Sequence, residues 1–158
     1  MNNCTGSPLV SLIVRTRNRP ELLKEALASI ARQGRQNLEV IIVNDGGCPV
    51  TGLATEQLVG RSVRVEDHAV CKGRAAAANS GLALVRGDYV GFLDDDDTIE
   101  PDHLESLMAV ALAHQQQPAV VYSAVRALRR GDCSSPPLAV GTRVAFVARF
   151  LGRRLSYT

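Results

Sequence analysis

The sequence of 158 residues contains no tryptophan and only three phenylalanines and three tyrosines. Nucleic-acid-binding proteins combine basic patches with interleaved aromatic side chains, so this scarcity argues against a nucleic-acid partner. No apolar run approaches the roughly eighteen residues of a membrane span, and the first ten residues lack the basic and then apolar layout of a signal peptide. The four cysteines form no Cys-x-x-Cys pair, which is typical of reduced thiols. We therefore expect a cytoplasmic location.

Two common phosphate-binding loops are missing as well. Neither the GxxxxGK[ST] pattern nor the GxGxxG pattern occurs in the chain. A phosphate-bearing ligand would therefore have to be held by other groups, such as a bound cation or arginine side chains.

The charges are distributed unevenly along the chain. Residues 126–158 contain seven arginines and one acidic residue, and because they contribute +6 to a net charge of +2, the first 125 residues carry −4. The basic segment could contact an anionic membrane surface, which would make the protein peripheral at the inner membrane face. We favour the simpler interpretation of a solvated end segment.

Strand patterns alternate with helix patterns, which predicts one α/β domain with a mostly parallel sheet flanked by helices on both faces. The expected strands cover residues 8–16, 38–44, 62–66 and 88–94, and the expected helices cover 20–34, 73–85 and a segment that begins at Pro101. Residues 45–52 are predicted as a turn. Strands over 119–128 and 138–150, joined by a turn at 131–137, predict a C-terminal hairpin.

Ligands of such sheets bind beyond the carboxyl ends of the strands. The sequence places "RTRNR", "NDGG" and "DDDD" at these ends, the last being Asp94–Asp97. Four adjacent carboxylates repel one another, and three explanations are open: a solvated turn, a divalent-metal site, or the nucleophilic aspartate of a phosphotransferase. Hard oxygen ligands suit Mg²⁺ or Mn²⁺, which commonly share their coordination sphere with substrate phosphates. The pattern therefore suggests a nucleotide diphosphate held through a metal ion.

Several motifs in order resemble the nucleotide-binding part of family 2 glycosyltransferases, which have the Rossmann-like GT-A fold. "VSLIVRTRNRPELLKEALASI" resembles that family's first strand, Pro-Thr-x-Asn-Arg loop and first helix, and "LEVIIVNDGG" resembles its second strand with an Asp-Asp-Gly-Ser turn. "GRAAAANSGLALVRGDYVGFLDDDDTIEP" resembles its helix, strand and Asp-x-Asp motif. The resemblance covers residues 9–117 and implies a nucleotide-diphosphate sugar donor, with UDP as the default base and GDP or dTDP as alternatives.

The resemblance assigns the nucleotide contacts residue by residue. Asp45 would accept a hydrogen bond from the uracil ring, while Thr16 and Arg19 would line the base and ribose. Arg74 would contact the base or the diphosphate, and Asn79 would brace this loop. Two simpler explanations stay open: Asp45 as a turn carboxylate that binds backbone amides, and Arg74 as a solvated helix start.

Within the Asp-x-Asp motif, the resemblance implies that Asp94 faces the ribose or sugar and that Asp96 binds Mn²⁺ or Mg²⁺. Asp95 is also assigned to the nucleotide-sugar site, and Asp97 flanks it. For Asp97 and Thr98 we favour a role in capping the helix that follows.

Four positions depart from the family pattern. Arg15 stands where the family usually has proline, Asn44 replaces the first aspartate of the turn, and Gly47 replaces its serine. Ala78 occupies a place where many members carry arginine. These changes bear on the assignment of the nucleotide more than on the predicted fold.

Two rival interpretations arise from the same acidic stretch. "FLDDDDTI" fits the motif of haloacid-dehalogenase-like phosphatases, with Asp94 as nucleophile and Asp96 as acid, but no lysine follows it as that family requires. The spacing from Asp94 to Glu105 also fits a calcium loop, although Ile99 stands where the sharp turn needs glycine.

Inverting transfer needs a general base, which the family draws from a carboxylate well downstream of Asp96. The sole acid beyond Glu105 is Asp132, and His68, His103 and His114 receive no catalytic role, so the catalytic residue is unknown. We therefore expect a donor-binding fragment of the enzyme, inactive in transfer by itself. A nucleotide-binding module without transfer activity is the alternative.

The expected organisation is an N-terminal tail over residues 1–8, a nucleotide-sugar-binding domain over 9–129, and a hairpin with the basic segment over 130–158. The last part would begin an acceptor-binding half for a carbohydrate or lipid-linked acceptor, in the setting of polysaccharide biosynthesis that is common in the family. Its uncovered apolar face would favour self-association.

Overall fold

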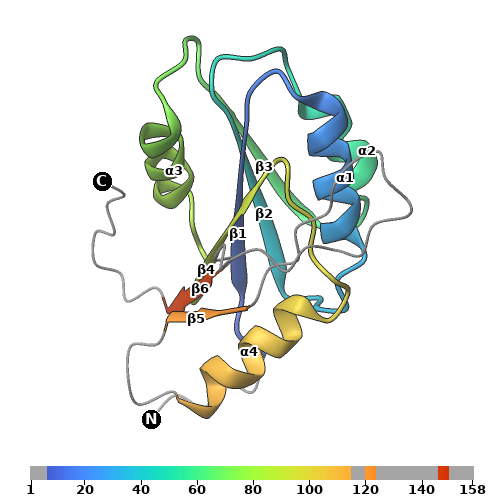
Figure 1. Ribbon diagram of the computed structural model, residues 1–158, viewed down its shortest axis with the longest axis vertical. Coiled ribbons are helices and arrows are strands. Elements are labelled where there is room, and N and C mark those ends of the chain that lie inside the picture. The colour runs from blue at the N-terminus through green and yellow to red at the C-terminus, as the bar shows by residue number, and fades with distance from the viewer. Residues whose placement is uncertain (1–6, 115–119, 124–145, 150–158) are drawn as a thin grey trace, which may run out of the picture.

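The computed structural model describes residues 7–114, residues 120–123 and the backbone of residues 146–149. Figure 1 shows its strands and helices in chain order. The strands are β1 (Val10–Thr16), β2 (Leu38–Asn44), β3 (Ser62–Asp67), β4 (Tyr89–Asp94), β5 (Val120–Tyr122) and β6 (Phe146–Arg149). The helices are α1 (Pro20–Ala31), α2 (Thr51–Gln57), α3 (Arg74–Ala83) and α4 (His103–Ala113).

The strands form one sheet in the order β3-β2-β1-β4-β6-β5. The first four are parallel, while β6 runs antiparallel to both β4 and β5. Thr16 pairs with Asn44, and Arg15 pairs with Asp94, so three strands end at the same level. We call this end of the sheet, with residues 15–19, 44–47 and 94–97, the carboxyl edge; it lies at the top of Figure 1.

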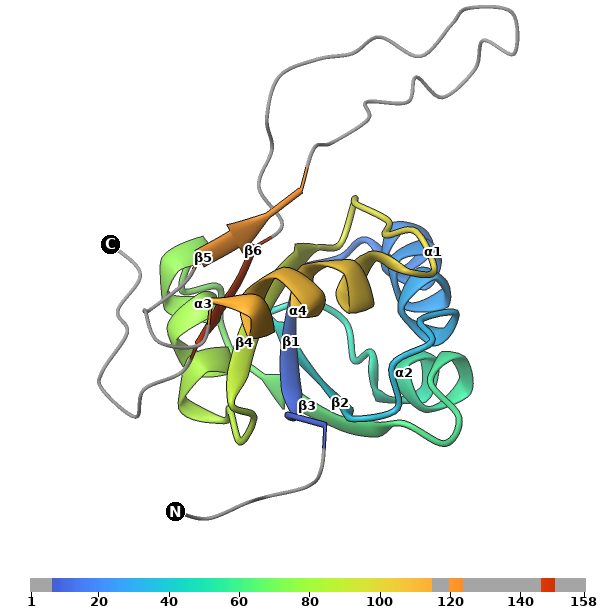
Figure 2. The ribbon, with the colours of Figure 1, turned by 90° about the horizontal axis from the view of Figure 1, so that it is seen from below.

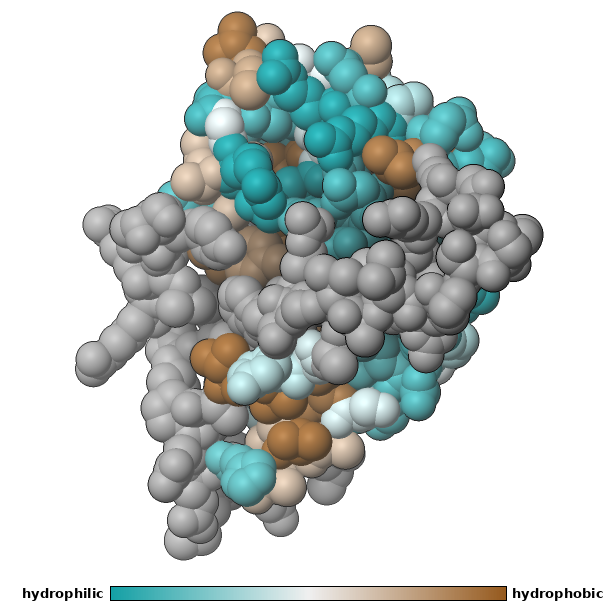
Figure 3. Space-filling model, viewed as in Figure 1, coloured by the Kyte–Doolittle hydropathy of each residue, from teal (hydrophilic) through white to brown (hydrophobic). Residues whose placement is uncertain are grey.

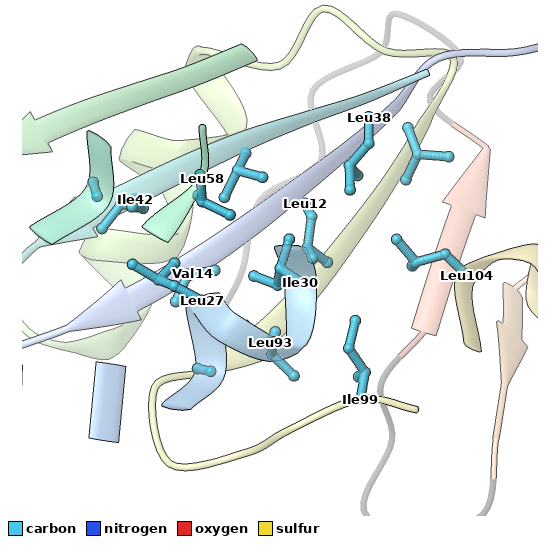
Figure 4. Packing of buried hydrophobic residues seen from close by; sticks show 14 of the residues in the cluster. Leu12, Val14, Leu27, Ile30, Leu38, Ile42, Leu58, Leu93, Ile99 and Leu104 are labelled. Atoms are coloured by element: carbon cyan, nitrogen blue, oxygen red, sulfur yellow. The ribbon is translucent and has the colours of Figure 1, made fainter. Parts of the chain in front are cut away.

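Helices cover both faces of the sheet, as Figure 2 shows with α3 on one side and α1 and α2 on the other. β1 divides its apolar residues between the two faces because side chains alternate along a strand. Leu12 and Val14 pack with Leu27 and Ile30 of α1 in the larger core cluster (Figure 4), whereas Ile13 packs on the α3 side. The predicted parallel α/β sheet is thus confirmed.

Two helices differ from the prediction. Helix α2 was not expected, because the Gly-Gly and Pro residues before it hid an apolar period: Val50, Ala54 and Leu58 are buried four residues apart. Helix α4 begins at His103 rather than at Pro101, which lies in a turn. The predicted capping by Asp97 and Thr98 is therefore wrong, since neither residue adjoins the start of α4.

The C-terminal hairpin is confirmed where the structure describes it, as β5 and β6 pair antiparallel from Val120 with Ala148 to Tyr122 with Phe146. The predicted strands are longer than the described ones, and the predicted turn at 131–137 and basic tail lie outside the described residues. Among the described residues, no helix has both the length and the apolar character that crossing a membrane requires.

A buried carboxylate ties the opposite, amino end of the sheet together. Glu39 accepts hydrogen bonds from the Ser11 hydroxyl, from Arg64 at 2.7 Å and from the Arg86 amide at 2.7 Å. Burial alone would raise the pKa of Glu39, but these hydrogen bonds outweigh it and hold the pKa below its usual value. These hydrogen bonds therefore link β1, β2, β3 and the loop before β4. The charged residues of the carboxyl edge form a separate group at the other end of the sheet.

Candidate active site at the carboxyl edge

The carboxyl edge gathers aspartates and arginines, and hydrophilic side chains cover this part of the surface in Figure 3. Asp94 is the last residue of β4, and Asp95 begins the turn that follows. Asp94 forms ion pairs with Arg15 and, at 3.3 Å, with Arg74. Asp95 is buried and accepts hydrogen bonds from Thr16 Oγ1 at 2.8 Å and from Arg19 Nη1 at 3.2 Å. Guanidinium groups thus offset the repulsion between neighbouring carboxylates.

Three of the aspartates bring carboxylate oxygens close together. One carboxylate oxygen each from Asp94, Asp96 and Asp97 lies within 4.8 Å of the other two. An all-oxygen donor set of this kind fits Mg²⁺ or Mn²⁺, with room left for water and phosphate ligands. The sequence prediction named Asp96 alone as the metal ligand. Asp97 joins this cluster because a tight turn, with the Asp97 amide bonded to the Asp94 carbonyl at 3.1 Å, brings it back toward Asp94.

Asp45 lies at the end of β2 and is buried. Its Oδ1 accepts hydrogen bonds from the Lys72 amide at 2.8 Å and from His68 Nδ1 at 2.7 Å. Its Oδ2 accepts from the Gly73 amide at 2.8 Å and from the Cys71 thiol at 3.2 Å. Burial alone would raise the pKa of the Asp45 carboxyl, but the four donors outweigh it and hold the pKa far below its usual range. Asp45 is thus a fixed carboxylate that can only accept hydrogen bonds.

His68 was assigned no role from the sequence, and the structure makes it the support of Asp45. Its ring is buried between two side chains, with Nε2 2.8 Å from Ser80 Oγ of α3. Since an ionised carboxylate only accepts, Nδ1 of His68 carries the proton toward Asp45. Asn79, predicted to brace this loop, lies on the exposed side of α3 next to Ser80.

Asn44 and Gly47 fit closely together in the turn after β2. The Asn44 amide nitrogen donates to Asp67 Oδ1 at 2.7 Å and to the Cys48 carbonyl at 2.9 Å. A Cβ added to Gly47 would lie 2.6 Å from Asn44 Oδ1, so the Asn44 conformation leaves no space for a larger residue at position 47. The Asn44 side chain therefore holds together the turn that carries Asp45.

Gly46 lets the loop that carries Cys71 approach this turn. Gly46 has φ +74°, and a Cβ added there would lie 2.4 Å from the Cys71 nitrogen. We expect Gly46→Ala to lower the free energy of unfolding by about 2–4 kcal/mol, the sum of the strain of left-handed alanine and of overpacking. Chemical denaturation would measure this.

Gly60→Ala is the matched control, because Gly60 has φ +79° and open space around its Cβ position. It should carry only the backbone cost, roughly 1–2 kcal/mol. Equal costs for the two variants would contradict the close approach of the two loops.

The family model for "Glycosyl transferase family 2" matches residues 11–138. The chain belongs to glycosyl transferase family 2. This membership rules out the phosphatase interpretation of the acidic stretch. The calcium loop is also wrong, because Glu105 pairs with Arg35 at 3.3 Å instead of joining Asp94 and Asp96.

Curated relatives from this glycosyltransferase family match the same region. Glycosyltransferase GlyA of Streptococcus pneumoniae is 33% identical over 115 residues, which cover 70% of this chain and 16% of GlyA. Glycosyltransferase GlyG of the same species is 33% identical over 103 residues, which cover 64% of this chain and 34% of GlyG. The family 2 chain described here thus spans about a third or less of the length of these relatives.

Solved structures of glycosyltransferases share the fold. S. aureus TarS 1–349 in complex with UDP-GlcNAc superposes with a TM-score of 0.64 at 27% identity, covering 71% of this chain and 33% of TarS 1–349. The mannosyltransferase PcManGT of Pyrobaculum calidifontis, in complex with GDP-Man and Mn²⁺, superposes with a TM-score of 0.61 at 27% identity, covering 78% of this chain and 37% of PcManGT. The parallel sheet with flanking helices is therefore GT-A-like.

Proposed function

We propose that the chain is the donor-binding part of a metal-dependent, inverting glycosyltransferase that uses a UDP-sugar. The observation that carries the proposal is the carboxyl edge itself, where the Asp94, Asp96 and Asp97 oxygens converge beside a fixed, ionised Asp45. The similarity to TarS with UDP-GlcNAc and to PcManGT with GDP-Man and Mn²⁺ supports a nucleotide-sugar donor and a cation at this edge.

The proposed roles follow from the side chains present. Asp96 and Asp97, with one oxygen of Asp94, would hold Mn²⁺ or Mg²⁺, which when bound stabilises the negative charge of the departing diphosphate. Arg74 is exposed at the start of α3 and would bind a diphosphate oxygen, since guanidinium groups suit phosphate geometry. Thr16 and Asp95 are already bonded to each other, and we propose that they shape the nucleoside pocket through Arg19.

The site lacks a candidate for the general base among the described residues. Asp45, Asp94 and Asp95 each accept hydrogen bonds from neighbouring groups, and Asp96 and Asp97 are proposed metal ligands. Because the chain spans about a third of the length of GlyG, we propose that the acceptor binds in a further part of the enzyme. The general base would lie in that part as well. The acceptor would be a carbohydrate or a lipid-linked sugar.

Metal dependence gives the direct test of the proposal. We expect UDP to bind with Mn²⁺ present, and Asp96→Asn to weaken this binding by about 10- to 100-fold, the range seen when metal sites lose supporting groups. Calorimetric titration with UDP would measure the effect, with Asp102→Asn as the control because Asp102 is an exposed residue beyond the acidic stretch. Equal affinities for the wild type and Asp96→Asn would sink the metal assignment.

A further inference from the structure

Arg15 is the one residue of the carboxyl edge whose side chain is both cationic and largely buried. Its side chain is 12% exposed, compared with 83% for Arg74 and 52% for Arg19. The β1–β4 register places Arg15 directly opposite Asp94, and the guanidinium Nη2 pairs with Asp94 Oδ1. Its Nη1 also donates to the Arg74 carbonyl at 3.3 Å. Arg15 is therefore fixed between β4 and the start of α3.

The two arginines occupy different oxygens of Asp94. Arg15 takes Oδ1, and the exposed Arg74 takes Oδ2 at 3.3 Å. A cation that binds Asp94 together with Asp96 and Asp97 can displace Arg74 into solvent or toward a phosphate at little cost. It cannot displace Arg15 as easily, because Arg15 is packed in the sheet and would leave a buried charge without its partner.

A permanent positive charge beside Asp94 has two opposite consequences. It repels a divalent cation at the same carboxylate, which weakens binding of the metal alone. It also supplies positive charge next to the position proposed for the diphosphate, which a metal would otherwise have to provide alone. Proline, the usual residue of the family at this position, carries no charge. It would neither repel a cation nor supply positive charge near the diphosphate.

We propose that Arg15 is a built-in counter-charge for Asp94, which reduces the dependence of UDP binding on a divalent cation at this site. The inference rests on the proposed function, both for the cation site and for the identity of the nucleotide. The effect of Arg15 on Mn²⁺ can be measured without a nucleotide, because the Arg15–Asp94 pair is present in either case.

The test compares Arg15→Met with Arg17→Met, which removes the same charge from an exposed position just after β1. Titration of Mn²⁺ alone, followed by electron paramagnetic resonance, should show about tenfold tighter binding to Arg15→Met and about the wild-type affinity for Arg17→Met. Titration of UDP should show that the ratio of Kd in EDTA to Kd in Mn²⁺ rises about tenfold in Arg15→Met.

The direction of the Mn²⁺ effect separates a counter-charge from a structural role, since a merely damaged site would bind Mn²⁺ more weakly. Unchanged or weaker Mn²⁺ binding by a folded Arg15→Met protein would overturn the inference. If thermal melting shows that Arg15→Met is unfolded, Arg15→Gln, which removes the charge but keeps a hydrogen-bond donor for Asp94, should still tighten Mn²⁺ binding by about threefold, and no change would overturn it. A wild type that binds Mn²⁺ but no UDP would defeat the proposed function and leave the Mn²⁺ comparison intact.

Discussion

Asp45→Ala should lower the affinity for UDP by about tenfold or more and bring the affinities for UDP and CDP close together. Uracil offers an N3–H donor that cytosine lacks, and the ionised Asp45 can only accept. Both Asp45 oxygens are already occupied by two donors each. The Cys71 thiol is the weakest of these donors and belongs to an exposed residue, so we expect the uracil N3–H to take its place.

A matched variant separates base recognition from support of the loop. Cys71→Ala removes the donor that the base would replace and leaves the Lys72 and Gly73 amides on Asp45. It should keep the preference for UDP over CDP, whereas Asp45→Ala should lose it. Competition titrations with the two nucleotides would measure both ratios. If Asp45→Ala kept the wild-type ratio, Asp45 would be only the turn carboxylate that organises residues 68–73.

A polypeptide of these 158 residues should bind the donor but transfer sugar at least about 10²- to 10⁴-fold more slowly than a full-length relative, since that is the typical contribution of a general base. Loss of acceptor positioning can add a larger factor. A fusion of this chain to the part of a relative that lies beyond the matched region should transfer sugar, whereas the same fusion with Asp96→Asn should not. Transfer of radiolabelled sugar to a hydroxyl acceptor would measure the rates. A rate for the chain alone that matched the full-length relative would contradict the proposal that the general base lies in a further part of the enzyme.

The sequence predicted β1 and β2 well because each is a run of buried, mostly β-branched or aliphatic residues, and β4 because it is a short apolar run with two aromatic residues. Residues 45–52 were harder, since local turn chemistry at Gly46, Gly47 and Pro49 dominates a pattern in which Val50 and Ala54 already begin an amphipathic helix. The start of α4 was placed two residues early because proline is common in the first helical turn. Here Pro101 instead lies in the turn before α4.

The place of the site was predictable, because parallel strands end at one edge of the sheet and the charged motifs follow those strands. The partners within the site were not. The pairing of Arg15 with Asp94 depends on the β1–β4 register, and the support of Asp45 by His68 depends on the path of a loop after β3.

Surface apolar residues bear on the predicted self-association, which stays a prediction. Val110, Val120 and Tyr122 are exposed, on α4 and β5. Light scattering on the isolated chain and on a fusion with an acceptor-binding part would show whether covering an apolar face keeps the protein monomeric.

The central claim, that the nucleotide binds at the carboxyl edge, is tested most directly by hydrogen–deuterium exchange with and without UDP and Mn²⁺. The opposite end of the sheet provides an internal comparison, because an open hollow of about 610 Å³ lies there, lined by Gly34, Arg35, Asn37 and Glu105 among others. We predict slower exchange in peptides that contain residues 44–48, 70–74 and 94–98, and unchanged exchange in peptides over residues 33–37. Protection over 33–37 with no change at 44–48 and 94–98 would contradict the account.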